Sequence, residues 1–160
     1  MKKSKMLYAG TFDPITNGHL DVIIRGSRLS DDFTVGVLRN TSKSPLFSVE
    51  ERIELIRRST EGIDNLEIDS FEGLLADYVK KKGFNIVIRG LRVSMDFEYE
   101  IQMAQMNAVL YDTAVETIFL MTNPAHSFIS SSLVKEVFSL GGSVEGFVPQ
   151  AVLEALHEKY

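Results

Sequence analysis

The sequence contains no cysteine among its 160 residues. This absence excludes disulfide bonds, thiolate zinc sites, iron–sulfur clusters and a cysteine nucleophile, and it suits the reducing cytoplasm that we expect for the protein. No apolar run approaches the roughly 20 residues that span a bilayer, and the basic start MKKSK is not followed by a signal-peptide core. We therefore expect neither export nor contact with a membrane.

Positive charge is not in excess. The 17 Lys and Arg residues stand against 22 Asp and Glu residues, which gives a formal net charge of −5. A field of this sign repels nucleic acid, so we expect no nucleic-acid partner, and any phosphate-binding site must be a local cluster of charge.

Several familiar motifs are also missing. The chain has neither the GxGxxG dinucleotide fingerprint nor the P-loop sequence GxxxxGK[ST], and it has no GxSxG nucleophile elbow. It has no HExxH sequence and no other paired spacing of metal ligands. We therefore predict no metal that the protein holds by itself.

The overall composition is that of a globular domain. Hydrophobic residues make up 44% and charged residues 24%, close to the averages for such domains. No repeat and no Pro- or Ser-rich linker divides the chain, and its length is about that of one domain. We predict a single domain over residues 1–160.

Short apolar runs alternate with segments whose apolar residues have helical spacing. The runs lack strict alternation, which is typical of strands covered on both faces, and they lie at residues 6–9, 33–38, 66–68, 86–88 and 117–121. Helices are expected after His19, from a capping box at residues 48–51, over residues 74–82 up to Gly83, from Ser94 or Asp96, over residues 131–140 and from Pro149. This order predicts an α/β fold with a doubly wound, five-stranded parallel sheet.

In such sheets, ligands bind beyond the carboxyl ends of the strands. The corresponding loops are residues 10–19, 39–47, 69–75, 89–96 and 122–132. The first loop, GTFDPITNGH, leads from a strand to a helix start, where free N–H groups attract anions. Gly18 would let a phosphate approach the backbone beside His19. The alternative is that Gly10 and Gly18 only shape turns and that His19 caps the helix.

Arg89 and Arg92 flank a Gly-Leu pair at the end of the fourth expected strand. A guanidinium is costly to bury unless it meets an anion, and its planar fork matches a phosphate. The alternative is that the two arginines form ion pairs with Asp96, Glu98 or Glu100.

Two further loops contribute polar groups. Lys43 is a loop lysine that could equally be solvated, and the serines of residues 127–132 could bind phosphate or merely cap the next helix. Together with His19 and the arginines, these groups supply positive charge and no nucleophile with a base beside it. Such an inventory favours phosphoryl or nucleotidyl transfer, in which positioning and charge stabilisation provide most of the catalysis.

Two motifs carry a resemblance to known enzymes. Residues 16–19, TNGH, resemble the TxGH form of the HxGH motif of the nucleotidyltransferase superfamily, and residues 129–132, ISSS, resemble its second phosphate-binding motif. Residues 10–14, 89–92, 96–100, 106–107 and 127–136 resemble the bacterial phosphopantetheine adenylyltransferase family, so the resemblance covers essentially the whole chain.

This resemblance implies a Rossmann-like nucleotidyltransferase fold and a reaction of coenzyme A biosynthesis. The adenylyl group of ATP is transferred to 4′-phosphopantetheine, which releases pyrophosphate and gives dephospho-coenzyme A. It also implies a cytoplasmic homohexamer, and Mg²⁺ that arrives with ATP. Asp13 could approach that ion, although an aspartate before Pro14 more often stabilises its turn.

The resemblance also implies roles for individual residues. His19 would stabilise the transition state, with Lys43 and Arg92 as further catalytic cations. The residues implied in ATP binding are Thr11, Phe12, His19, Gly90, Leu91, Arg92, Glu100, His126, Ser127, Phe128, Ile129, Ser130, Ser131 and Ser132. Those implied in binding the acceptor are Thr11, Lys43, Leu75 and Arg89. The chain departs from the family pattern at Ala9, often proline, at Ser44, often lysine, and at His126, often tryptophan or tyrosine.

The mechanism expected from these groups is a direct in-line attack by a phosphate oxygen on the α-phosphorus, without a covalent enzyme intermediate. Two unit charges about 4 Å apart interact with about 4 kcal/mol at an effective dielectric of about 20, so cations must offset the repulsion. Two alternatives remain open, namely another small nucleotidyltransferase of the superfamily and a non-catalytic ATP-binding regulator. Met103 and Met106 are expected to belong to a core stripe rather than to a subunit interface.

Overall fold

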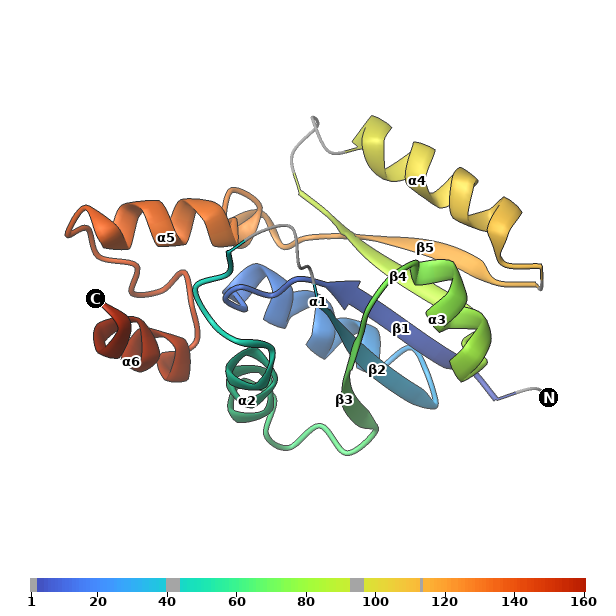
Figure 1. Cartoon of the computed structure of the whole chain (residues 1–160), viewed down its shortest axis with the longest axis horizontal. Coiled ribbons are helices and arrows are strands. Elements are labelled where there is room, and N and C mark those ends of the chain that lie inside the picture. Colours follow the sequence, from blue (N-terminus) through green and yellow to red (C-terminus); the bar gives the residue numbers. More distant parts are fainter. Residues whose placement is uncertain (1–2, 40–43, 93–96, 113) are drawn as a thin grey trace.

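The computed structural model describes residues 3–39, 44–92, 97–112 and 114–160. Five strands alternate with helices, as predicted (Figure 1). The elements are β1 (Lys5–Gly10), α1 (Asn17–Ser27), β2 (Asp32–Leu38), α2 (Val49–Ser59), β3 (Leu66–Phe71), α3 (Leu75–Lys82), β4 (Ile86–Leu91), α4 (Phe97–Leu110), β5 (Glu116–Met121), the 3₁₀ turn η2 (Pro124–His126), α5 (Ser131–Ser139) and α6 (Gln150–Lys159).

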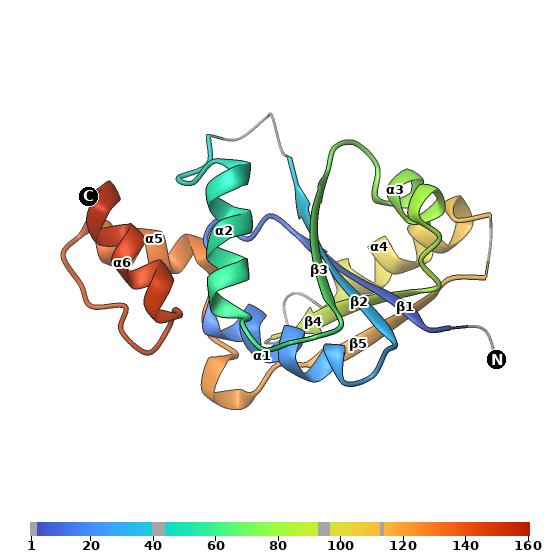
Figure 2. The same ribbon diagram turned by 90° about the horizontal axis from the view of Figure 1, so that it is seen from below.

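The sheet is parallel throughout and has the order β3-β2-β1-β4-β5. The order of the strands reverses between β1 and β4, where Met6 pairs with Ile86 and Tyr8 with Ile88. Helices α1 and α2 lie on one side of the sheet and α3 and α4 on the other (Figure 2). This confirms the predicted doubly wound α/β fold, in which the reversal point is where ligands bind.

Side chains of β1 show how the sheet is buried on both faces. Met6 and Tyr8 belong to the larger core, which also contains residues of α1, α2, α5 and α6. Leu7 and Ala9 belong to a second core with residues of α3. Because successive side chains of a strand point to opposite faces, an uninterrupted apolar run fills both cores.

Local sequence signals set several helix ends. The predicted capping box is present at α2, where Ser48 Oγ accepts the N–H of Glu51 and the Glu51 side chain accepts the N–H of Ser48. Helix α3 ends at Gly83, whose φ of 71° lies in the left-handed region that favours glycine. The last helix was predicted to start at Pro149. Pro149 is instead the N-cap residue, and α6 itself begins one residue later, at Gln150. The predicted start at Ser94 or Asp96 lies outside the described residues.

Two strands run further than their apolar residues predicted. The loops expected to begin at Asp69 and Arg89 begin later, because β3 continues to Phe71 and β4 to Leu91. The parallel ladder between β4 and β5 continues through Arg89 and Leu91. Backbone hydrogen bonds hold this ladder whatever the side chain, so polar residues extend the strands.

The predicted core stripe on α4 is wrong. No residue of this helix is buried, and Met103, Met106 and Val109 are 41%, 61% and 77% exposed. The helix turns Ile101 and Ala104 towards the sheet, where both are half-buried. Helical spacing marks an apolar face but does not say what covers it. None of the helices in the described ranges is long and apolar enough to cross a membrane.

A buried carboxylate ties together the segments that surround the site. Asp13 is 4% exposed and accepts the backbone N–H groups of Leu46 and Phe47, each at 2.9 Å. It also accepts a hydrogen bond from Lys135 Nζ of α5 at 2.8 Å. Burial by itself raises the pKa of Asp13, but Lys135 and the two N–H groups outweigh it and hold this pKa below its usual value.

Arg52 of α2 reinforces the same junction. Its side chain is buried and donates hydrogen bonds to the carbonyl oxygens of Thr11 at 2.8 Å, Leu38 at 3.2 Å and Phe47 at 3.1 Å. The loops after β1 and β2 are therefore fastened to each other and, through Asp13, to α5. We call these hydrogen bonds of Asp13, Arg52 and Lys135 the clamp. Asp13 therefore connects separate segments of the chain and does more than stabilise the turn before Pro14.

Candidate active site

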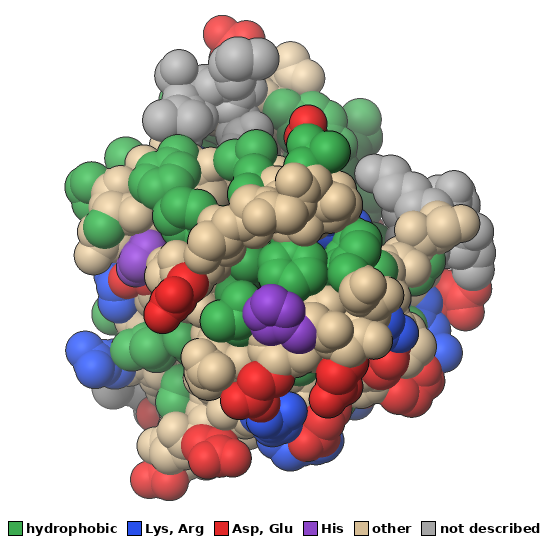
Figure 3. Space-filling view, turned by 90° about the vertical axis from the view of Figure 1, so that its left-hand side faces the viewer, with side chains coloured by type: hydrophobic (Ala, Val, Ile, Leu, Met, Phe, Trp, Pro, Cys, Tyr) green, Lys and Arg blue, Asp and Glu red, His purple; other side chains and the backbone are tan. Residues whose placement is uncertain are grey.

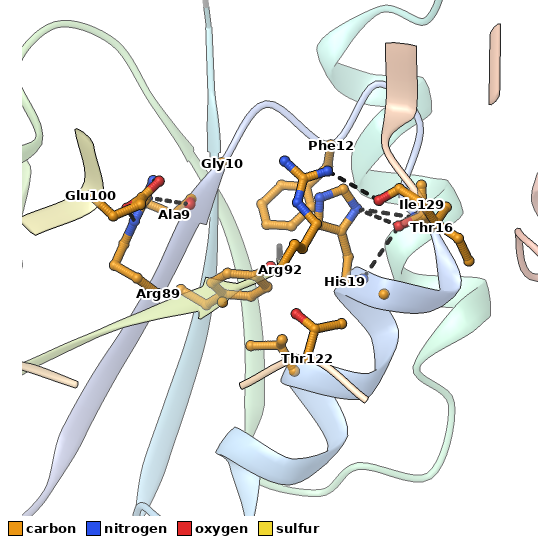
Figure 4. A pocket seen from close by; sticks show the side chains of 14 residues that line it. Ala9, Gly10, Phe12, Thr16, His19, Arg89, Arg92, Glu100, Thr122 and Ile129 are labelled. Carbon is orange, nitrogen blue, oxygen red and sulfur yellow. Dashed lines mark hydrogen bonds and ion pairs between the residues drawn. The ribbon is translucent and has the colours of Figure 1, made fainter. Parts of the chain in front are cut away.

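A pocket opens at the carboxyl ends of the strands, where β1 and β4 lie side by side (Figure 4). Figure 3 looks onto this end of the molecule, where apolar and neutral side chains occupy the middle of the view and most charged ones lie below them. The pocket is lined by Tyr8, Ala9, Gly10, Phe12, Thr16, Gly18, His19, Val22, Arg89, Gly90, Arg92, Glu100, Thr122 and Ile129. The structure thus brings together seven of the residues predicted for the site, namely Phe12, His19, Arg89, Gly90, Arg92, Glu100 and Ile129.

His19 is held by the residue that begins α1. The N–H of Thr16 donates to His19 Nδ1 at 3.0 Å, and the N–H of His19 donates to Thr16 Oγ1 at 3.3 Å. These bonds form a capping box, so the alternative that His19 caps the helix is also correct. Because a backbone N–H can only donate, Nδ1 is an acceptor, and the neutral ring carries its proton on Nε2.

The charge state of His19 follows from its surroundings. Burial, and to a lesser extent the positive charge of Arg92, lowers the pKa of His19 to about 4. The ring is therefore neutral at pH 7, and its Nε2–H is left to act as a hydrogen-bond donor in the pocket. A neutral donor adds no further positive charge beside the arginines.

An aromatic residue positions the imidazole. Phe12 packs edge-on against the His19 ring, with centroids 5.0 Å apart, and against Tyr8 at 5.3 Å. The backbone of Phe12 has a φ of 50°, an uncommon conformation for a residue with a side chain. A Cβ on Gly10 would lie 3.1 Å from the Phe12 ring, so this close packing favours glycine there.

Arg89 forms the ion pair that was the alternative interpretation. Its Nε and Nη2 donate to the two carboxylate oxygens of Glu100 at 2.8 and 2.9 Å, and its Nη1 donates to the Ala9 carbonyl at 3.2 Å. Burial alone lowers the pKa of Arg89, but Glu100 outweighs this effect and raises it. Glu100, which was predicted to contact ATP, thus holds the guanidinium at the rim of the pocket.

Arg92 links β4 to the serine-rich loop. Its Nη1 donates to the carbonyl oxygen of Ile129 at 3.0 Å. Ser130 caps α5 by accepting the N–H of Leu133, and Ser131 Oγ donates to the carbonyl oxygen of Pro14 at 2.7 Å. The helix-capping interpretation is therefore correct for Ser130, and the loop is anchored beside the first loop.

The remaining predicted residues do not line this pocket. Thr11, Leu91, His126, Ser127, Phe128, Ser130, Ser131 and Ser132 lie in the segments around it, and Lys43 lies outside the described residues. His126 is half-buried in η2, and the exposed Phe128 packs edge-on against Phe147 at 5.6 Å. Leu75 lines a second pocket.

This second pocket adjoins the first and shares Arg89 and Glu100 with it. Its walls come from the start of α3, from α4 and from strands β4 and β5. They are mainly apolar and include Leu75, Met103 and Tyr111. The two pockets meet at the Arg89–Glu100 pair, so a polar group can bind at the junction while an apolar arm extends along α4.

Sequence reasoning assigned no site role to several lining residues, among them Tyr8, Val22, Thr16 of the TNGH motif and Thr122 of the last predicted loop. Tyr8 lies inside a buried strand and looks like an ordinary core residue in the sequence. Thr122 directly follows β5, and only its place at a strand end could have pointed to the site. Among the described residues, no group of three or more His, Asp or Glu side chains is arranged to hold a metal ion.

We expect His19 in the ligand-free protein to titrate with a pKa of about 4 in an NMR experiment, with its neutral form protonated on Nε2. The unfolded chain binds this proton with an ordinary pKa near 6.5. His19 should therefore lower the free energy of unfolding as the pH falls from about 6.5 towards 4, and it has no such effect above that range. His19→Gln should remove this contribution. Titration near 6.5, or a proton on Nδ1, would contradict the assignment.

Comparison with known proteins gives one family. Residues 7–137 match the cytidylyltransferase-like family. The proteins named phosphopantetheine adenylyltransferase in Clostridium novyi and Caldanaerobacter subterraneus are each 52% identical to this chain, covering 96% of it and 94% and 96% of their own lengths. That of Dictyoglomus turgidum is 50% identical over 98% of the chain and 97% of its own length.

A solved structure supports the fold alone. The lipopolysaccharide core biosynthesis protein of Thermoplasma volcanium aligns with a TM-score of 0.57 at 19% identity, over 76% of this chain and 98% of that protein. The sequence relatives are far closer and extend over nearly the whole chain. The chain therefore belongs to the phosphopantetheine adenylyltransferase family, and it is a nucleotidyltransferase of the cytidylyltransferase-like group.

Proposed function

We propose that this protein transfers the adenylyl group of ATP to 4′-phosphopantetheine, giving dephospho-coenzyme A and pyrophosphate, as a step of coenzyme A biosynthesis. The observation that carries the proposal is a single pocket in which the neutral donor His19 meets Arg89 of β4 and Arg92, which directly follows β4. About half of the residues are identical to relatives that bear the name of this activity.

The reaction is an in-line displacement at the α-phosphorus of ATP. A phosphate oxygen of the acceptor attacks, the bond to the pyrophosphate breaks, and no covalent enzyme intermediate forms. His19 Nε2–H donates to the α-phosphate as negative charge builds on it, and the N-terminus of α1 faces the same group. The attacking phosphate is already ionised, so no general base is needed.

The two adjoining pockets suit the two substrates. ATP occupies the pocket that contains His19 and Arg92, and the acceptor phosphate lies at Arg89, where the pockets meet. The pantetheine arm then extends along the apolar second pocket past Leu75. Thr11 and Lys43 would add contacts to the acceptor, and His126 and the serine-rich loop would bind the β- and γ-phosphates.

Magnesium fits this site only together with the nucleotide. Asp13 is engaged by Lys135 and two backbone N–H groups, and Glu100 is engaged by Arg89. Phosphate oxygens of the nucleotide and water would therefore be the main ligands of the ion, which is how Mg²⁺ commonly binds in nucleotide sites. The ion would neutralise charge on the phosphates.

The proposal is tested by incubating the protein with ATP and 4′-phosphopantetheine and following pyrophosphate and dephospho-coenzyme A. We expect His19→Ala to reduce turnover by roughly 10²–10³, while the affinity for ATP changes much less. His157→Ala, a histidine of α6 that does not line either pocket, is the matched control and should keep its turnover. Transfer to nicotinamide mononucleotide or a phospho-alcohol instead would favour another nucleotidyltransferase, and ATP binding without any transfer would favour a regulator.

Arg89→Ala is expected to raise the KM for 4′-phosphopantetheine by at least about tenfold and to affect ATP much less, because it removes the cation at the junction of the pockets. Steady-state kinetics with each substrate varied in turn measures this difference. Arg58→Ala, which removes an arginine paired with Glu154 on the surface, is the control. If only the KM for ATP rises, the roles assigned to Arg89 and Arg92 are exchanged.

We further propose that the protein works in the cytoplasm as a homohexamer. Support comes from the apolar side chains that α4 and the edge strand β5 leave exposed, including Met106, Val109 and Met121. Sedimentation should give six times the chain mass of 17.9 kDa. Val109→Lys should reduce this mass, whereas Leu140→Lys, at an equally exposed position after α5, should not. A wild-type monomer would contradict the proposal.

A further inference from the structure

Two hydroxyl groups in the pocket have no role in the mechanism above. Tyr8 lies in the central strand β1 and is 7% exposed, and Thr122 directly follows β5 and is 6% exposed. Both residues line the pocket, and the Thr122 hydroxyl points towards its interior (Figure 4). Tyr8 thus lies in one of the strands that flank β4, and Thr122 lies just beyond the end of the other.

Both oxygen atoms are accessible from the pocket, and neither has a hydrogen-bond partner among the residues that the structure describes. Buried Tyr and Thr hydroxyls normally have one, because an unmade hydrogen bond costs free energy. The same chain follows this rule elsewhere. The Tyr78 hydroxyl donates to Asp69 Oδ2 at 2.8 Å, and Thr60 Oγ1 donates to the carbonyl oxygen of Ile56 at 2.8 Å. The two pocket hydroxyls differ from these, because they face open space and leave their hydrogen bonds to water or to a ligand.

The two hydroxyls converge on one point of the pocket. A Cβ placed on Gly90 would lie 3.7 Å from Tyr8 Oη and 3.7 Å from Thr122 Oγ1, and 3.1 Å from a methyl group of Val22. Glycine keeps this space free of a side chain. A ligand that lies over Gly90 thus meets one hydroxyl on each side of β4.

The surroundings favour the oxygen atoms of a nucleotide. The charges of Arg89 and Arg92 act on the Tyr8 hydroxyl, and the centroid of the His19 ring lies 6.4 Å from that of Tyr8. Burial raises the pKa of Tyr8 to about 12, so the hydroxyl keeps its proton at pH 7 and can donate it. Thr122 can both donate and accept, which suits either a phosphate oxygen or a ribose hydroxyl.

We infer that Tyr8 and Thr122 are nucleotide-binding residues, whose hydroxyls hydrogen-bond to oxygen atoms of the ATP that lies over Gly90. The inference rests on the proposed use of this pocket for ATP. It assigns a recognition role to Tyr8, which the sequence pattern groups with the core, and to Thr122, which the sequence places in a loop without a role.

The test uses Tyr8→Phe and Thr122→Val, each of which removes the hydroxyl and keeps most of the side-chain volume. Isothermal titration calorimetry with Mg-ATP should give a Kd about tenfold higher for each variant, as expected for one lost hydrogen bond to a phosphate or ribose oxygen. The Kd for 4′-phosphopantetheine should stay the same. The Tm of the ligand-free variants should stay close to that of the wild type, because each change removes a hydroxyl that has no hydrogen bond within the described protein.

Tyr78→Phe is the matched control, since this hydroxyl has a partner and does not line the pocket. It should lower the Tm and leave the Kd for ATP unchanged. If Tyr8→Phe and Thr122→Val behave in the same way, or change neither quantity, the inference is wrong. A wild-type protein that binds ATP but transfers nothing to 4′-phosphopantetheine would overturn the proposed function and leave this inference standing. Failure of the wild type to bind ATP would overturn both.

Discussion

Parallel pairing of β1 with β4 is the constraint on which the site depends. Ala9 and Arg89 are 80 positions apart in the sequence, yet this pairing lets the Arg89 side chain donate a hydrogen bond to the Ala9 carbonyl oxygen. Because the two strands run in the same direction, the residues at and just after their carboxyl ends lie at the same edge of the sheet. His19 at the start of α1, Arg89 of β4 and Arg92 just after β4 therefore meet at this edge.

The site is less strongly positive than its residue types suggest. Arg89 is neutralised by Glu100, and His19 is uncharged at neutral pH because burial opposes its protonation. An acidic chain can therefore hold two polyanionic reactants without a broad basic surface. Charge is presented at the end of one strand and at one helix start, where fixed dipoles and donors are already oriented.

The sequence predicted what local patterns determine. Apolar runs marked the five strands, the capping box at Ser48 marked a helix start, and the TNGH and ISSS motifs marked two sides of the pocket. Long-range choices could not be predicted in this way. The partner of Arg89 was one of three acidic residues, and the pattern on α4 could not distinguish an inner from an outer face. Tyr8 escaped notice because buried strand residues look alike until their neighbours are known, and Thr122 because its place in a predicted loop does not say where its hydroxyl points.

The clamp formed by Asp13, Arg52 and Lys135 has a consequence for how the protein tolerates change. It joins the loop after β1 to Leu46, Phe47 and α5 through hydrogen bonds, so these segments are held together in the absence of a substrate. Affinity is then not diminished by the entropy of ordering these loops. Because these segments are linked, a substitution that displaces one of them also disturbs the other two. Helix α4 takes no part in the clamp, so changes of acceptor specificity are more easily accommodated along α4.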